Sequence, residues 1–264
     1  MVEKPSNRAR ASRSTMAEPR RCPKTGTGRA TIANTSCSVV AFRLSPAKAT
    51  WGGARNRADR ASEVLADRKV DDLLHAARFA LATGRTFQRH WIVHYGRAGV
   101  AAEDGAAFVR RLLDPLHKLA RRAGGELTAL WVREHASTYG EHVHILLHLP
   151  FGLSLRNRTR RWIEAAGGTY QPGVSMVKSV GGRLDKQTAN NGSNTDEHHR
   201  ANAANVVRYL LKSASAEKGD QLGLTRHGRG GHIIGKRCGW TQNIGEAARM
   251  RHRQFAKRII GALP

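Results

Sequence analysis

The stretch of sequence that decides the fold is residues 127–149, LTALWVREHASTYGEHVHILLHL. Two runs of mainly apolar residues, 127–134 and 142–149, flank a connection of seven residues, 135–141, which includes a glycine. Two such runs with so short a connection are typical of a β-hairpin. A turn centred on Thr138 places Glu134 directly opposite His142, where paired side chains on one sheet face have Cβ atoms about 4.5–5.5 Å apart.

The second run of this hairpin carries two histidines with one residue between them, His142 and His144. Side chains two residues apart on a strand point to the same face, about 6–7 Å apart along it. The opposite face of the run carries Val143, Ile145, Leu147 and Leu149 and is expected to face the core. The two imidazoles are therefore expected to converge on one ion.

Glu134 is the third candidate ligand of this ion, because the hairpin register puts its carboxylate beside both histidines. The three side chains predict a site for Mg²⁺ or Mn²⁺, with two imidazoles favouring Mn²⁺. Glu141 would face the other side of the sheet, and His148 lies about 13 Å along the strand from His144. His94 and His135 remain candidate neighbours of the ion.

Apolar patterns around the hairpin predict the rest of the fold. Alternation predicts strands at 90–95 (HWIVHY) and 174–180, and helical periodicity predicts helices at 103–122, 154–166 and 202–213. The order is then strand, helix, strand, strand, helix, strand, helix. This order predicts an α+β fold of the ferredoxin-like split βαβ type, with a central antiparallel sheet and helices on one face.

The chain is predicted to have four parts. Residues 1–56 read as a disordered basic arm, 57–84 as a helix that precedes the domain, 85–216 as the domain itself, and 217–264 as a Gly-rich basic loop followed by a basic helix. Residues 181–200 read as a polar loop within the domain. The basic side chains that are candidates for DNA contact in the last part are Arg226, Arg229, Lys236, Arg237, Arg249 and Arg253.

The charge of the chain points to a polyanionic partner. Forty-five Lys and Arg stand against 20 Asp and Glu in 264 residues, for a formal charge of +25. Such an excess is typical of proteins that bind nucleic acid. Cys22, Cys37 and Cys238 show no metal-binding or disulfide spacing, which fits a reducing, cytoplasmic location. No apolar run approaches the roughly 20 residues of a membrane helix, so no membrane partner is expected.

Tyr209 and Lys212 form the second candidate group, on the helix predicted from residue 202. Residues three apart share a helix face. A phenol ordinarily ionises near pH 10, and a neighbouring ammonium and metal ion favour the phenolate, which is the better nucleophile. The alternative is a tyrosine at the edge of the core beside a lysine in solvent.

In combination, these motifs resemble those of the HUH endonucleases, over residues 88–213. The shared motifs are the strand His90–Tyr95, the acidic Glu134, the pair His142-Val143-His144, and Tyr209 with Lys212, in that order. The resemblance implies site-specific nicking and joining of single-stranded DNA through a phosphotyrosine on Tyr209. It also implies a 5′ phosphate on the enzyme and a free 3′ hydroxyl, and a metal held by the Glu and the two His.

Within that family the pattern is closest to the initiators of rolling-circle replication of plasmids or phages, for which a host replication helicase or polymerase is a further candidate partner. The long interval between His144 and Tyr209 also fits single-tyrosine transposases.

Two other classes of protein remain open. A zinc hydrolase could use the same His and Glu set without Tyr209, and a non-catalytic basic protein could bind nucleic acid with neither. No G-x-x-x-x-G-K-[ST] motif is present, so no helicase motor is expected in this chain.

Overall fold

The computed structural model describes residues 59–150, 152–180, 195–228 and 230–260. The arm predicted at 1–56, Arg229 and most of the loop predicted at 181–200 lie outside these residues. The last part of that predicted loop is helical, because α5 begins at Thr195.

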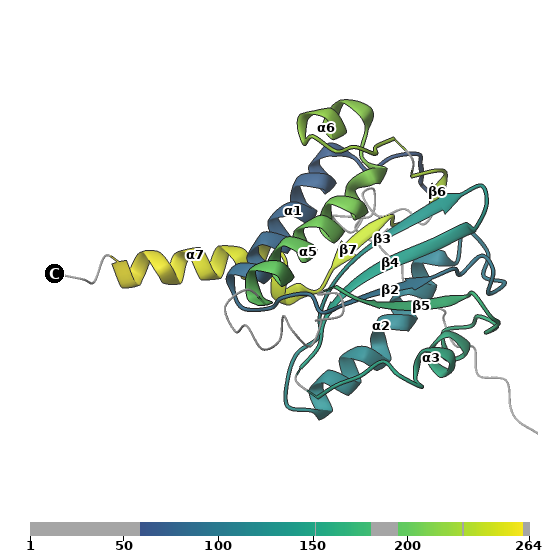
Figure 1. Cartoon of the computed structure of the whole chain (residues 1–264), viewed down its shortest axis with the longest axis horizontal. Coiled ribbons are helices and arrows are strands. Elements are labelled where there is room, and N and C mark those ends of the chain that lie inside the picture. Colours follow the sequence, from purple (N-terminus) through teal and green to yellow (C-terminus); the bar gives the residue numbers. More distant parts are fainter. Residues whose placement is uncertain (1–58, 151, 181–194, 229, 261–264) are drawn as a thin grey trace, which may run out of the picture. The chain divides into compact units, whose positions relative to one another are not determined.

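The centre of the fold is a five-stranded antiparallel sheet in the order β5-β2-β4-β3-β7 (Figure 1). Its strands are β2 (Arg89–Val93), β3 (Thr128–Ala136), β4 (Gly140–His148), β5 (Ser175–Ser179) and β7 (Cys238–Trp240). The hairpin of β3 and β4 pairs Glu134 with His142, as the seven-residue connection predicts. Gly140 closes the turn at φ 64°, a left-handed conformation that glycine adopts without strain.

The connections of the sheet agree in part with the ferredoxin-like arrangement. α2 (Gly105–Arg122) joins β2 to β3, with β4 between them, and α3 (Thr159–Ala165) joins β4 to β5, with β2 between them. The fifth strand, β7, comes from the segment 217–264 that was predicted as loop and helix. Gly239 lets β7 lie against β3, because a Cβ there would be 2.8 Å from the Trp131 ring.

Helices cover both faces of the sheet, so the prediction of helices on one face is wrong. α2 and α3 pack on the face of Trp91, Val143 and Ile145. α1 (Asp67–Ala82) and α5 (Thr195–Leu210) pack on the other face, over Leu130 and Leu146. The physical reason lies in β3 and β4, whose central residues are apolar on both faces, as in sheets that are buried on both sides.

The remaining elements surround the second face. η2 (Leu211–Ser213) continues α5, and α6 (Ala216–Gln221) follows it. β1 (Ala61–Ser62) pairs with β6 (Ile233–Ile234), and η3 (Gln242–Ile244) leads into α7 (Glu246–Ile260). Among the described residues, the helices are all too short or too polar to cross a membrane.

Candidate active site

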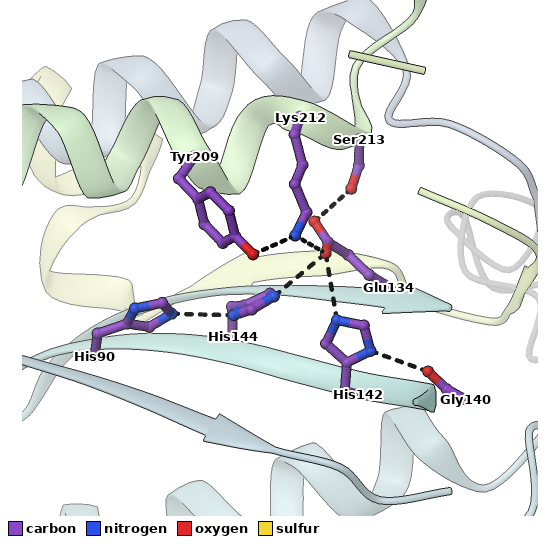
Figure 2. A network of polar contacts seen from close by, with 8 residues as sticks. All are labelled: His90, Glu134, Gly140, His142, His144, Tyr209, Lys212 and Ser213. Atoms are coloured by element: carbon purple, nitrogen blue, oxygen red, sulfur yellow. Dashed lines mark hydrogen bonds and ion pairs between the residues drawn. The ribbon is translucent and has the colours of Figure 1, made fainter. Parts of the chain in front are cut away.

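Glu134, His142 and His144 meet at the end of β3 and β4 on the face that α1 and α5 cover (Figure 2). Glu134 Oε2 lies 3.5 Å from His142 Nε2 and 3.3 Å from His144 Nε2. One ligand atom from each residue lies within 4.8 Å of the other two, and all three side chains are buried. The geometry expected from the hairpin therefore brings the three predicted ligands together.

Neighbouring groups hold each of these three side chains in place. His142 Nδ1 donates to the Gly140 carbonyl at 3.0 Å, which turns its Nε2 toward Glu134. His144 Nδ1 shares a hydrogen bond of 3.0 Å with His90 Nε2, and the Ser213 hydroxyl donates to Glu134 Oε1 at 2.7 Å. Contacts of this kind orient metal ligands and fix the tautomer of the imidazoles.

The surroundings favour the charged form of Glu134 and the neutral forms of His144 and His90. Burial acts to raise the pKa of Glu134, but the adjoining His142 and His144 imidazoles and the charge of Lys212 outweigh it and hold that pKa below its ordinary value. Burial lowers the pKa of His144, against the opposing effect of Glu134. Burial also lowers the pKa of His90 to about 3, with help from His144. An ionised carboxylate and neutral imidazoles are the forms that bind metals.

One buried atom of the triad is left without a hydrogen bond. Among the described residues, His144 Nε2 has no hydrogen-bond partner although it is fully shielded from solvent. Buried polar atoms are otherwise paired in most proteins. A free imidazole nitrogen beside a second imidazole and a carboxylate fits a divalent metal ion, so these three residues could hold one.

The other histidines and the rival carboxylate lie outside the triad. His94 lies beside the triad, with its ring centroid 5.2 Å from that of His142 and a buried Nδ1 that lacks a partner among the described residues. His148 Nδ1 donates to the Thr86 carbonyl at 2.8 Å. His135 and Glu141 pair with each other in the register and face the opposite side from Glu134, as expected from strand alternation.

Tyr209 and Lys212 reach this triad from α5 and η2 (Figure 2). Lys212 Nζ donates to the Tyr209 hydroxyl at 2.7 Å and lies 2.8 Å from Glu134 Oε2. The Tyr209 ring stands edge-on to the His144 ring, with centroids 5.4 Å apart. The Tyr209 side chain remains 41% exposed, so the hydroxyl group is open to a substrate while it is connected to the buried carboxylate.

The predicted DNA-contacting residues fall into different surroundings. Arg226 is exposed and lines a cavity with Tyr209 and Lys212. Arg253 is exposed on α7, and Arg249 donates to the Ile244 carbonyl at 3.2 Å. Lys236 is exposed, with its ammonium 5.4 Å from the centre of the Trp131 ring.

Arg237 is buried, which differs from the surface position expected for a DNA contact. Its guanidinium donates to the Ser62 hydroxyl at 2.9 Å and to the carbonyls of Ser62 and Gly231. The Gly-rich segment folds back onto β1 here, and its buried carbonyls need a donor. Arg237 therefore joins the two segments.

Two residues that the sequence does not single out complete the site, His90 and Ser213. Alternation along β2 places His90 on the face opposite Trp91, but its contact with His144 depends on how β2 pairs with β4. Ser213 follows Lys212 directly, and only the 3₁₀ turn after α5 brings it to Glu134. Comparisons with known protein families, curated proteins and solved structures find no match to this chain.

Proposed function

We propose that this protein is a metal-dependent endonuclease that nicks and rejoins single-stranded DNA at specific sites, through a covalent phosphotyrosine on Tyr209, as HUH endonucleases do. One observation carries the proposal: Lys212 Nζ lies 2.7 Å from the Tyr209 hydroxyl and 2.8 Å from Glu134 Oε2. A possible nucleophile, a cation and three metal-ligand side chains thus form one contiguous group. A transesterification at phosphorus needs these parts together.

Each side chain has a role in this reaction. The Tyr209 oxygen attacks the phosphorus, and the bond to the 3′ oxygen breaks with its electron pair on that oxygen. The product is a 5′ phosphotyrosine and a free 3′ hydroxyl, which takes up a proton as the phenol gives one to solvent. Lys212 hydrogen-bonds to the phenolic oxygen and holds it next to the Glu134 carboxylate. A metal ion held by Glu134, His142 and His144, Mg²⁺ or Mn²⁺, would polarise the scissile phosphate.

The charge of the chain supports single-stranded DNA as the substrate, because a formal charge of +25 attracts a polyanion. We place the activity in the cytoplasm, at the start of rolling-circle replication of a plasmid or phage. There the free 3′ hydroxyl would prime a host polymerase behind a host helicase. A single-tyrosine transposase would use the same chemistry and would rejoin that hydroxyl to another strand.

The deciding experiment is a search for the covalent product. Labelled single-stranded DNA incubated with the protein and Mn²⁺ should yield a protein–DNA band on a denaturing gel. Tyr209→Phe keeps the ring and removes only the attacking oxygen, so it should lose the band and keep the unfolding temperature. Tyr139→Phe is the matched control, since Tyr139 is 50% exposed beside His94 and should leave the band intact.

Other outcomes would assign the protein to another class. A band that persists in Tyr209→Phe would refute the role of Tyr209. Cleavage without any band would favour a hydrolase, such as a zinc enzyme, in which water attacks. DNA binding without cleavage under any metal would indicate a non-catalytic binding protein. Lys212→Ala should slow formation of the band without abolishing it, because Lys212 makes no bond to the DNA.

A further inference from the structure

A cavity of about 460 Å³ lies beside Tyr209, between α5 and residues 223–226. That volume is in the range of pockets that bind small ligands. It shares Tyr209 and Lys212 with the site described above, and its lining includes none of Glu134, His142 and His144. The lining residues are Asn205, Arg208, Tyr209, Lys212, Gly223, Leu224, Thr225 and Arg226.

The lining of this cavity is positive and contains no carboxylate. Lys212 already pairs with Glu134 at 2.8 Å. Arg208 and Arg226, in contrast, make no ion pair with a carboxylate anywhere in the described part of the chain. Two guanidinium groups without counter-charges beside one cavity favour an anionic ligand, and the guanidinium fork suits phosphate oxygens.

The segment that carries Arg226 is anchored on both sides. The Arg208 guanidinium donates to the carbonyls of Leu222 and Gly223, at 3.2 and 2.7 Å, and so ties the segment to α5. Leu224 is buried in the core under α5. On the other side His227 Nε2 lies 2.9 Å from an Asp220 carboxylate oxygen. The wall of the cavity is therefore formed before any ligand binds, which lowers the entropic cost of binding.

We propose that this cavity binds the phosphate next to the scissile one on the single-stranded substrate, with Arg226 as its main contact and Arg208 as the second. The inference rests on the proposed function, because it takes the Tyr209 hydroxyl as the point of attack. A strand whose scissile phosphate lies at Tyr209 continues by one nucleotide into the adjoining cavity. Asn205 and Thr225 supply uncharged hydrogen-bonding groups for the sugar or base of that nucleotide.

The first test measures DNA binding without catalysis. In the full-length Tyr209→Phe protein with a metal chelator, fluorescence anisotropy gives the affinity for labelled single-stranded DNA over a range of salt concentrations. Arg226→Gln should weaken binding about tenfold, as expected for the loss of a charged hydrogen bond. It should also reduce the slope of log K against log salt by about 0.7, the effect of one phosphate contact on a single strand. Arg226→Lys should restore the slope.

The matched control is Arg110→Gln, which removes the same charge from an exposed position on α2, on the opposite face of the sheet. An equal loss of affinity in this control would overturn the proposal, since net charge alone would then explain it. An unchanged slope in Arg226→Gln would overturn it as well. Unfolding temperatures of all variants show whether any loss of binding comes from loss of fold.

The second test separates this inference from the proposed function. With Tyr209 intact and Mn²⁺ present, Arg226→Gln should raise the DNA concentration for half-maximal adduct formation far more than it lowers the rate at saturating DNA. The opposite split would refute a binding role for Arg226. If the wild-type protein forms no adduct at all, the proposed nuclease activity fails, whereas the metal-free salt slopes still decide whether Arg226 contacts a phosphate.

Discussion

The ion pair of Glu134 and Lys212 allows a prediction about folding stability that can be measured without metal. Glu134→Gln keeps the size of the side chain and an acceptor for the Ser213 hydroxyl, and removes the charge. Lys212 Nζ then loses the carboxylate that lies 2.8 Å away. The Glu134 side chain is 1% exposed and that of Lys212 15%, so water replaces the lost partner poorly.

The size of the effect follows from this burial. Removal of one partner from a fully buried ion pair costs about 3–5 kcal/mol. Lys212 keeps some contact with water and its hydrogen bond to Tyr209, so we expect about 2–3 kcal/mol for Glu134→Gln. For a folded region of this size that corresponds to an unfolding temperature lower by about 4–12 °C.

The assay is chemical and thermal unfolding in a chelator, with a double-mutant cycle. Lys212→Met in the Glu134→Gln background removes the stranded ammonium, so the double variant should be more stable than Glu134→Gln alone. The control is Glu164→Gln in the exposed pair with Arg160, 3.0 Å apart, which should change stability by less than about 1 kcal/mol. Strictly additive effects of Glu134→Gln and Lys212→Met would refute the reasoning.

Three further predictions concern the ligand shell and the core. Ser213→Ala removes the hydrogen bond to Glu134 Oε1, so Mn²⁺ affinity measured by calorimetry should fall about 10- to 100-fold; unchanged affinity would exclude Ser213 from the metal site. Gly239→Ala would put a Cβ 2.8 Å from the Trp131 ring, so it should lower the free energy of unfolding by about 1–3 kcal/mol in urea. An unchanged free energy of unfolding would mean that β7 is loosely held. Burial raises the pKa of Cys238 to about 11, so an alkylating reagent at pH 8 should label this thiol only after the protein unfolds. Peptide mass spectrometry measures the labelling, and rapid labelling of the native protein would contradict the burial of Cys238.

The hairpin and the triad could be predicted from sequence because their geometry is local. A connection of seven residues leaves few registers, and strand alternation then decides which side chains share a face. Glu134 opposite His142, with His144 two residues on, follows from these two facts alone. The spacing of Tyr209 and Lys212 on one helix face is local in the same way.

The features that sequence analysis missed all depend on contacts between distant segments. His90 meets His144 through the pairing of β2 with β4, and β7 joins the sheet about a hundred residues after its partner β3. Arginine is a residue type usually found at the surface, but the Gly-rich segment folds back and buries Arg237. Helices on both faces were missed because the polar histidines of β4 suggested a solvated face. The centre of that face is apolar, with Leu130, Val132 and Leu146 in the second core, and its polar residues lie toward the two ends of β3 and β4.

The candidate site exists because α1 and α5 cover the second face of the sheet. α5 is held over the sheet by Val207, Leu210 and Leu211, which pack in the same core as Leu130 and Leu146. The core ends where Glu134 and the two histidines replace apolar residues along β3 and β4, and at that point the last turn of α5 presents Tyr209 (Figure 2). With helices on one face only, the triad would lie in water, where its carboxylate would be hydrated and Lys212 absent. The apolar contacts of α5 thus set the distance between Tyr209 and the Glu134, His142 and His144 side chains. A reaction that uses both groups depends on that packing as much as on the polar residues themselves.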